Sequence, residues 1–460
     1  MEFYNVPAKN ITISGEFDVV VCGGGPSGCA AAIAAAGNGA KTLLIEKYGY
    51  LGGATVSQFV MPVLSMNGLD FEGVWHEWAY ALDEMGGMGE LRKRRGRLVD
   101  GSVDPELVKY VWDKLLTAAG ARILHHAWVS EVMMDHNAIC GVIVETVAGA
   151  MAIKAGRVVD CTGDGTVCNL AGVPWEQGDG KSKCAMAMTK PFRLGNAVMP
   201  EDFPSEEYNR KIDDDFKKAM ESGEFSDPII TSGRIVIYLK NWTRPLANRP
   251  EMLVGGPSRI LNVNPLDPWE LSEAERTARA QIRQVKDYYL KYCPGCENAY
   301  FLDSSNHIGT RSTRRIQGIA KVTGEDAFNF KKSPLSIAKS SWQIDVWPAD
   351  SFTASADKAP EGWNQKVYAG EYFDIPYGCL VADTVDNLLA GGRCISADHY
   401  AQSSLRIQQT CMATGEAAGT IAAMSLKAAA SPRCLDPLPV VNLLKEKRKQ
   451  IRPFYRLFGK

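Results

Sequence analysis

The chain has 460 residues, a formal net charge of -2 and 45% hydrophobic residues, which is typical of a globular protein with roughly two or three domains' worth of core. The near-neutral charge excludes a general nucleic-acid binder, which would carry a basic surface, and no apolar run is long enough to span a membrane. The twelve cysteines lack framework spacing and the N-terminus lacks a basic-then-apolar signal, so we expect a reduced, cytoplasmic protein.

The first elements that the sequence predicts are a strand, a glycine-rich turn, a helix and a second strand. A β-branched run covers Asp18–Cys22, the turn GGGPSG follows at 23–28, and an Ala-rich helix leads to a second apolar run at Thr42–Ile45. The acid Glu46 closes this unit. A dinucleotide-binding site requires this order of elements, and a plain βα turn is the simpler alternative.

Three glycines of the turn each have a physical task in a dinucleotide site. Gly23 permits the tight turn, Gly25 lets the backbone approach a pyrophosphate, and Gly28 lets the helix pack close to the strand. The N-terminus of the helix then faces the phosphates. Glu46 lies at about the 20-residue offset expected of the acid that accepts ribose hydroxyl groups.

A second glycine-rich turn covers residues 49–55 and directly follows Glu46. It is either a plain loop or a second approach to the same phosphates. Farther along, Asp104 as N-cap and Pro105 at the first helical position predict the start of a helix that Gly120 ends.

Three β-rich runs at 121–134, 138–146 and 150–161 predict a strand followed by a meander. The segment Gly163-Asp164-Gly165 follows after Thr162. It forms either a turn at a strand end or a stretch of backbone that passes close to a cofactor.

The pattern changes from Cys184 to about Asp374, which we interpret as an inserted second domain. A strong helix is predicted from Ser272 to Tyr292, with Ser272 as N-cap and Glu275 as its capping-box partner. Strands are predicted at 185–194, 233–239 and 259–263.

Near the C-terminus the sequence again predicts a strand, a turn and a small-residue helix, as it does at its start. The buried strand covers 387–390, the turn 391–393, and the Ala- and Gly-rich helix Ser404 to Met424. The helix would aim its positive end at the cofactor. The predicted division is therefore a split cofactor domain, residues 15–183 and 375–430, a substrate domain, 184–374, and a tail, 431–460. The basic stretch Lys445–Lys460 is either a solvated helix end or a contact for an acidic partner.

With these elements in place, the chain resembles the FAD-dependent oxidoreductases of glutathione-reductase-like topology, in particular a bacterial branch distantly related to fumarate reductase flavoproteins. The resemblance implies an α/β fold: a Rossmann-like FAD-binding domain with a central parallel sheet and a β-meander, and an inserted α+β substrate domain. It covers Phe17 to about Met424 and rests on the motifs GGGPSGCAAAIAA, LLIEKYGYLGGAT, VDPELVKYV, VVDCTGDGTV, GTRSTRRIQG and NLLAGGRCISADHYAQSSLRIQQTCMATGEAAGTIAA.

The resemblance also implies the residues that hold FAD. Gly23, Gly25, Pro26, Ser27 and Gly28 would hold the pyrophosphate, Glu46 and Lys47 the adenosine ribose, and the Val129 backbone the adenine edge. Gly53 and Thr55 would lie along the pyrophosphate and ribityl chain, Gly163 and Asp164 would line the cofactor, and Gly392 and Arg393 would lie near the ribityl–phosphate end. The helix that starts near Ser404 would place its N-terminus by the flavin pyrimidine. One departure stands out, because the family more often has a histidine at the position of Trp347. No role of that histidine carries over.

Candidate residues for chemistry lie in two places. His307 and Arg311 belong to a segment that also holds Arg314 and Arg315; it is either a basic turn with structural ion pairs or a base with anion-binding groups. His399, expected on a loop that borders the flavin, is the other candidate base. Arg406 would serve the start of the last helix or the substrate.

Two further patterns limit the function. Cys293 and Cys296 have disulfide-oxidoreductase spacing, but they follow a helix instead of opening one, so packing is the simpler interpretation. No second glycine fingerprint appears, which argues against a separate NAD(P)H domain. We predict no metal site.

The sequence therefore predicts an enzyme that exchanges a hydride between flavin N5 and a small polar organic substrate, with an unknown electron acceptor or donor. Two alternatives remain open: an FAD used structurally or in a non-redox elimination or isomerisation, and an electron-transfer subunit of a larger complex. A homo-oligomer is also left open.

Overall fold

The structure is a computed structural model, and it contains no helix both long and apolar enough to cross a membrane within the residues it describes. Those residues are 2–4, 7–64, 73–89, 92–94, 97–180, 183, 186–198, 205–241, 243–245, 250–352 and 359–449. The predicted domain boundary at Cys184 and the tail beyond residue 449 lie outside them.

A central, mostly parallel sheet confirms the predicted fold class. β1 (Ile13–Cys22) pairs in parallel with β2 (Thr42–Ile45) on one side and with β9 (Gly149–Asp160) on the other. β6 (Arg122–Leu124) extends the sheet beyond β2, and β18 (Leu388–Ala390) lies beside the second half of β9. A strand from the C-terminal part of the chain thus completes a sheet that the N-terminal part begins.

The predicted meander is also confirmed. β7 (Trp128–Asp135) and β8 (Ala138–Thr146) pair antiparallel with each other, and β8 pairs with the first half of β9. β9 therefore belongs to the meander at its start and to the parallel sheet at its end.

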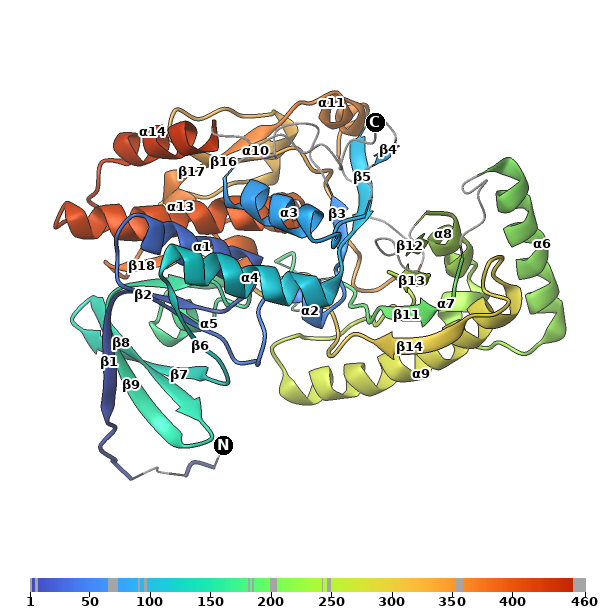
Figure 1. The fold of residues 1–460 in the computed structure, drawn as a ribbon, viewed down its shortest axis with the longest axis horizontal. Helices are drawn as coiled ribbons and strands as arrows, with labels where there is room; N and C mark the ends of the chain where they lie inside the picture. The colour runs from blue at the N-terminus through green and yellow to red at the C-terminus, as the bar shows by residue number, and fades with distance from the viewer. Residues whose placement is uncertain are drawn as a thin grey trace.

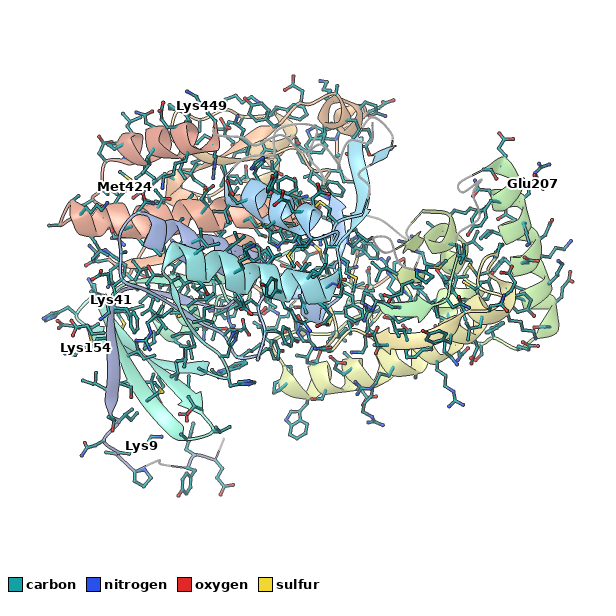
Figure 2. The ribbon with its side chains drawn as sticks, viewed as in Figure 1. Lys9, Lys41, Lys154, Glu207, Met424 and Lys449 are labelled. Atoms are coloured by element: carbon teal, nitrogen blue, oxygen red, sulfur yellow. The ribbon has the colours of Figure 1, made fainter. Side chains whose placement is uncertain are left out.

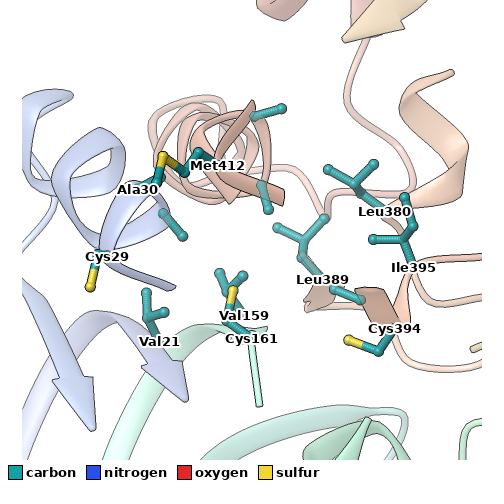
Figure 3. Packing of buried hydrophobic residues seen from close by; sticks show 14 of the residues in the cluster. Val21, Cys29, Ala30, Val159, Cys161, Leu380, Leu389, Cys394, Ile395 and Met412 are labelled. Carbon is teal, nitrogen blue, oxygen red and sulfur yellow. The ribbon is translucent and has the colours of Figure 1, made fainter. Parts of the chain in front are cut away.

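Helices from both ends of the chain cover this sheet. Figure 1 shows α1 (Pro26–Gly37) and α13 (Gln408–Lys427) side by side, with α4 (Pro105–Ala119) next to α1. Figure 3 shows Ala30 of α1 and Met412 of α13 close together in the buried core that continues to the strands. The predicted start of α4 is confirmed: Asp104 accepts a hydrogen bond from the Glu106 N–H, and Gly120 ends the helix with φ +81°.

The last helix is fastened to the same core. α14 (Pro437–Arg448) buries Val440, Val441 and Leu444. Arg448 Nε lies 2.9 Å from Glu416 Oε2 of α13, and both side chains are almost buried. This pair fixes the described end of the chain against α13.

A second body with its own core projects from the first, and we call it the cap. Its sheet has the order β12 (Thr243–Pro245), β13 (Glu251–Val254), β11 (Phe192–Gly195), β14 (Tyr300–Ser304), all antiparallel. Its helices are α6 (Glu206–Ser222), α7 (Pro228–Thr231), α8 (Arg234–Asn241) and α9 (Pro268–Tyr292). Figure 2 shows Glu207 of α6 at the far end of the molecule from Met424 of α13.

Two predicted strands of the cap are wrong. Residues 234–239 belong to α8, because Gly233 (φ +76°) turns the chain after α7 and Ile235 and Leu239 are buried one helical turn apart. Residues 259–263 make only a single bridge, between Met188 and Ile260.

Two predicted helix starts are also wrong. α9 begins at Pro268 with Asp267 as N-cap, so Glu275 is free to pair with Lys190 instead of closing a capping box. The helix expected from Ser404 is broken in two, α12 (His399–Leu405) and α13, where Ile407 turns to an extended conformation and packs on Trp342.

The structure describes further helices and strands beside these. They are α2 (Ala54–Ser57), β3 (Pro62–Leu64), α3 (Val74–Glu84), β4 (Arg92–Arg94), β5 (Arg97–Ser102), α5 (Thr166–Leu170), β10 (Trp175–Gln177), β15 (Arg314–Ile316), α10 (Gly324–Phe328), β16 (Ser336–Ser340), α11 (Trp363–Tyr368), β17 (Phe373–Pro376), η1 (Tyr377–Cys379) and η2 (Gly392–Cys394).

Candidate functional site

The first glycine turn is built so that only glycine fits at its two ends. Gly23 has φ +102°, and a Cβ there would lie 2.5 Å from the Cys161 carbonyl oxygen; a Cβ at Gly28 would lie 1.7 Å from the Gly23 carbonyl oxygen. At Gly25, the N-cap of α1, no side chain caps the helix. The N–H groups of the first turn therefore remain available to an anion, as a phosphate site requires.

A second helix N-terminus, that of α13, lies beyond the start of α1. α1 and α13 pack in parallel, since a Cβ at Gly415 would lie 2.0 Å from the Ser27 carbonyl oxygen and one at Gly419 2.0 Å from that of Ala31. α13 starts at Gln408 and so extends beyond the start of α1 by about 10 Å, at about 1.5 Å per residue. No side chain caps α13 either. The two uncapped N-termini suit a ligand with two separate electronegative groups.

The second glycine turn bridges these two N-termini. Gly52 donates to the Gly24 carbonyl at 2.9 Å, and a Cβ at Gly53 would lie 2.7 Å from the Gly25 Cα. Thr55 Oγ1 donates to Gln408 Oε1 at 2.5 Å. The turn predicted to reach the phosphates thus connects the start of α1 with the start of α13.

Glu46 lies at the other end of the first turn. Its carboxylate is buried and accepts hydrogen bonds from the N–H groups of Gly24, at 2.6 Å, and Tyr48, at 2.9 Å. Beside it is a cavity of about 420 Å³ whose lining includes Lys47, Tyr48 and Trp128. Lys47 Nζ lies 4.9 Å from the ring centre of Tyr48 and 4.8 Å from that of Trp128. Val129 follows Trp128 on β7. Aromatic rings and a carboxylate beside a phosphate turn suit an adenosine.

The ends of β9 and β18 are tied together by Arg393. Its Nη2 lies 2.7 Å from Asp164 Oδ1, and its Nε donates to the Gly163 carbonyl at 2.8 Å. Gly392 has φ +85° and donates to Thr414 Oγ1 of α13 at 3.1 Å. Four of the predicted cofactor residues are therefore brought together beside α13.

A profile of the family described as FAD dependent oxidoreductase matches residues 18–447. The chain belongs to this family. FAD is its cofactor, and the two glycine turns, the uncapped helix starts and Glu46 fit this dinucleotide.

The chain also matches individual proteins. Mitochondrial dihydrolipoyl dehydrogenase of Caenorhabditis elegans is 43% identical over 61 residues, which are 13% of this chain and only 12% of that enzyme. Among solved structures, a geranylgeranyl bacteriochlorophyll reductase-like protein from Thermoplasma acidophilum is 14% identical with a TM-score of 0.48, covering 94% of this chain and 84% of that one. L-proline dehydrogenase from P. horikoshii is 14% identical with a TM-score of 0.41, covering 96% and 100%. No assignment of activity follows from such distant likenesses.

Beside the start of α13 lies a group of polar and charged side chains that we call the α12 site: Arg311, Asp345, Trp347, His399, Gln402 and Arg406. Gln402 Nε2 donates to the Arg311 carbonyl at 3.2 Å, and Arg406 Nη2 lies 2.7 Å from Asp345 Oδ2. The Arg311 guanidinium lies 3.9 Å from the ring centre of Trp347. The site thus joins α12 to two extended segments.

His399 is the first residue of α12 and not part of a loop, so its predicted setting is wrong. The side chain is buried, and its Nδ1 has no hydrogen-bond partner within the described parts of the chain. Burial, reinforced by the charge of Arg315, lowers the pKa of His399 to about 4. The imidazole is therefore neutral near pH 7 and able to accept a proton from a ligand.

His307 lies elsewhere. Its ring stacks on Tyr48 at a centroid distance of 5.6 Å, and its Nδ1 lies 3.4 Å from Gln58 Nε2. Burial lowers the pKa of His307 as well. The structure thus places Arg311 and His399 in the α12 site. It places His307 beside Tyr48, whose N–H binds Glu46.

The other members of the predicted groups have structural contacts. Arg315 is buried and donates to the carbonyl groups of Ala397 and Gly178 at 3.0 and 2.8 Å. Ser404 Oγ donates to the Trp342 carbonyl at 2.7 Å, inside α12 and not at a helix start.

The CxxC pair ends α9. Cys293 is the C-cap residue, and Cys293 and Cys296 are both buried. The hydrogen bond with Cys296 and burial raise the pKa of Cys293, which disfavours the reactive thiolate. Within the described residues, no group of three or more His, Cys, Asp or Glu side chains could hold a metal ion.

Sequence reasoning missed three glutamines. Gln402 Oε1 and both amide atoms of Gln409 are buried without a hydrogen-bond partner among the described residues, and Gln408 binds Thr55. Buried amides with unused hydrogen-bonding capacity fit a site that receives a polar ligand. The signal was present in the sequence, because Gln-Gln opens an otherwise Ala- and Gly-rich buried helix.

Proposed function

We propose that this protein is a cytoplasmic enzyme that exchanges a hydride between FAD and a small polar organic molecule. The observation that carries the proposal is the α12 site. It gathers a neutral buried histidine, a buried amide and two guanidinium groups beside the start of α13. When bound, FAD supplies a hydride acceptor or donor at its N5 atom.

Within this function, His399 is the proposed catalytic base. A hydride transfer from a C–H bond needs a group that takes the accompanying proton, and Nδ1 of His399 has no hydrogen bond within the described residues that would compete. Arg311 is proposed to bind and orient the substrate. His307 is the second candidate base.

The proposed FAD contacts are those that the family resemblance implies. The N-terminus of α13, which begins at Gln408, takes the place that we expected for a helix start at Ser404. The set comprises Gly23, Gly25, Pro26, Ser27, Gly28, Glu46, Lys47, Gly53, Thr55, Val129, Gly163, Asp164, Gly392, Arg393 and the helix start expected near Ser404. Arg406 is proposed to serve the start of the last helix or the substrate.

The proposal also includes the topology, the relatives, the domain division and the partners of the protein. They are the glutathione-reductase-like topology, the relation to fumarate reductase flavoproteins, the division into residues 15–183 with 375–430, 184–374 and 431–460, an unidentified electron partner, the absence of a nucleic-acid partner, and self-association. The proposed division matters for experiments that isolate one domain. Residues between Ile316 and Phe373, which it assigns to the substrate domain, also contribute to the core around α1.

An anaerobic titration of the FAD-loaded protein tests the function. Alcohols, sugars and organic acids are added one at a time, and the flavin absorption band is followed. We expect at least one compound to bleach the band, and the variant His399→Gln to slow bleaching more than His307→Gln does. Turnover without bleaching would indicate non-redox use of FAD. Isolation with a tightly bound iron–sulfur protein would indicate an electron-transfer subunit.

A further inference from the structure

Trp347 is surrounded by guanidinium groups from three separate segments. The ring centre lies 3.9 Å from Arg311 Cζ, 5.0 Å from Arg259 Cζ and 5.6 Å from Arg234 Cζ. Arg234 belongs to α8 and Arg259 follows β13, so two of the three come from the cap. Arg259 is only 1% exposed, and attraction between a cation and an indole is strongest where water is excluded.

The indole N–H connects this group to a fourth arginine. Trp347 Nε1 donates to Asp345 Oδ1 at 2.8 Å, and Asp345 Oδ2 lies 2.7 Å from Arg406 Nη2. Arg406 Nη2 also donates to the Asp345 carbonyl at 2.9 Å. Trp347 and Asp345 therefore hold Arg311 on one side and Arg406 on the other.

The position of Arg311 is fixed twice. Its Nη1 donates to the Ala187 carbonyl and its Nη2 to Thr189 Oγ1, at 3.0 Å. Ala187 in turn donates its N–H to the Trp347 carbonyl at 3.1 Å. A guanidinium that is already oriented loses less entropy when a ligand binds to it.

Polar atoms with unused hydrogen-bonding capacity lie on the adjoining face of α12. His399 and Gln402 are more than nine-tenths buried, and His399 Nδ1 and Gln402 Oε1 have no hydrogen-bond partner among the residues that the structure describes. Arg406 ends α12, and α13 begins two residues later at Gln408. Nδ1 of a neutral imidazole can donate to an anion, whereas Gln402 Oε1 can only accept, so a ligand that satisfies both atoms carries a hydrogen-bond donor beside its negative charge.

We propose that the α12 site binds an organic anion, a carboxylate or a phosphate monoester, with Arg311 and Arg406 as its ligands and Trp347 as the positioning residue. This inference rests on the proposed function, for which it names the substrate class. The planar guanidinium fork matches both anions. The uncapped start of α13 adds positive potential beside the same site.

The test titrates the FAD-loaded protein with acetate, malonate and inorganic phosphate, and with the neutral amides acetamide and malonamide. Binding is followed by the perturbation of the flavin absorption band. We expect a saturable change with the anions and none with the amides. Trp347→Leu should weaken anion binding by about tenfold or more, since the support of Arg311 is lost.

Conservative and remote variants separate positioning from a general structural effect. Trp347→Phe keeps an aromatic face for Arg311 and should restore binding to within about threefold of the original protein. Arg276→Gln, on the exposed face of α9, should change nothing. With a substrate that bleaches the flavin, Trp347→Leu should raise KM more than it lowers kcat.

The outcomes distinguish this inference from the proposed function. Equal responses to acetate and acetamide, or unchanged anion binding in Trp347→Leu, would overturn the anion site. Bleaching by a neutral compound alone would keep hydride exchange and also overturn it. Anion binding without bleaching by any compound would support the site and reject the proposed function. Tighter binding of phosphate or of malonate would support the site and identify the kind of anion.

Discussion

The body that contains the central sheet, α1 and α13, which we call the FAD-binding body, and the cap are packed by opposite means. In the first, α1 and α13 meet through backbone, with Gly415 and Gly419 against Ser27 and Ala31. In the cap, the core is made of large rings: Phe192 meets Tyr289 edge to face at 5.9 Å. Backbone contact tolerates no added atom, whereas ring packing depends on total volume. Short sequence motifs with fixed glycines therefore specify the FAD-binding body, whereas no such motifs specify the cap.

The largest expected effect comes from adding atoms between α1 and α13. In Gly415→Val the new side chain would meet the Ser27 carbonyl, where even a Cβ lies at 2.0 Å. We expect a loss of about 3 kcal/mol or more in the free energy of unfolding, together with loss of FAD. Urea unfolding and flavin content measure both. Gly37→Ala, where a Cβ would meet nothing within 4 Å, is the matched control; equal stability of the two variants would contradict close backbone packing.

The next largest effect should be confined to the cap. Phe192→Ala removes a fully buried ring and should cost about 3–5 kcal/mol of cap stability. Because the FAD-binding body has a separate core, we expect the variant to retain FAD while proteases cut the cap faster. Trp269→Ala, at an 84% exposed position, serves as control. Loss of FAD from Phe192→Ala would show that the two bodies do not fold independently.

A smaller effect depends on pH and concerns the α12 site between the two bodies. The pKa of His399 is lowered to about 4 by burial, so the unfolded chain binds a proton at this residue below about pH 6.5 and the folded chain does not. The resulting stability is fully present above pH 6.5 and is lost as the pH falls toward 4, by up to about 3 kcal/mol.

Urea unfolding between pH 7.5 and 4.5 measures this loss. His399→Gln should flatten the pH dependence, whereas His136→Gln, at a side chain 97% exposed, should leave it unchanged. The same slope in both variants would mean that His399 does not titrate as its surroundings indicate.

The smallest effect concerns the adenosine end of the FAD-binding body. Glu46→Gln keeps the shape of the side chain but replaces an oxygen that accepts N–H groups, and we expect FAD to bind about tenfold more weakly. Flavin fluorescence measures the affinity. Glu16→Gln, on an exposed part of β1, should bind FAD normally, and unchanged affinity in Glu46→Gln would argue against contact with the ribose.

The sequence predicted the FAD-binding body well because its signals are local. Gly28 is imposed by the Gly23 carbonyl of the same turn and Gly23 by its own positive φ, and Asp104, Pro105 and Gly120 mark the two ends of α4. The order of β1, α1, β2 and Glu46 could therefore be predicted in full. The composition of the α12 site could be predicted only in part, as Arg311, His399 and Arg406.

The errors have tertiary causes. Residues 233–239 form a short apolar run that suits a strand or a helix equally, and packing in the cap decides for α8. The break between α12 and α13 follows from Ile407 packing on Trp342 and from Arg406 pairing with Asp345, both more than 60 residues away in sequence. Trp347 was noted only for the histidine that it replaces, since its arginine neighbours lie on distant segments.

The long separation between α1 and α13 has a consequence for biosynthesis. α1 ends at Gly37 and α13 begins at Gln408, so at about 5–20 residues per second a ribosome needs roughly 20–75 seconds to make the partner that covers α1. During that interval the nascent chain exposes the small-residue face of α1 and the edge of β9 that β18 later covers. FAD binding that depends on the start of α13 therefore has to wait until α13 has been synthesised.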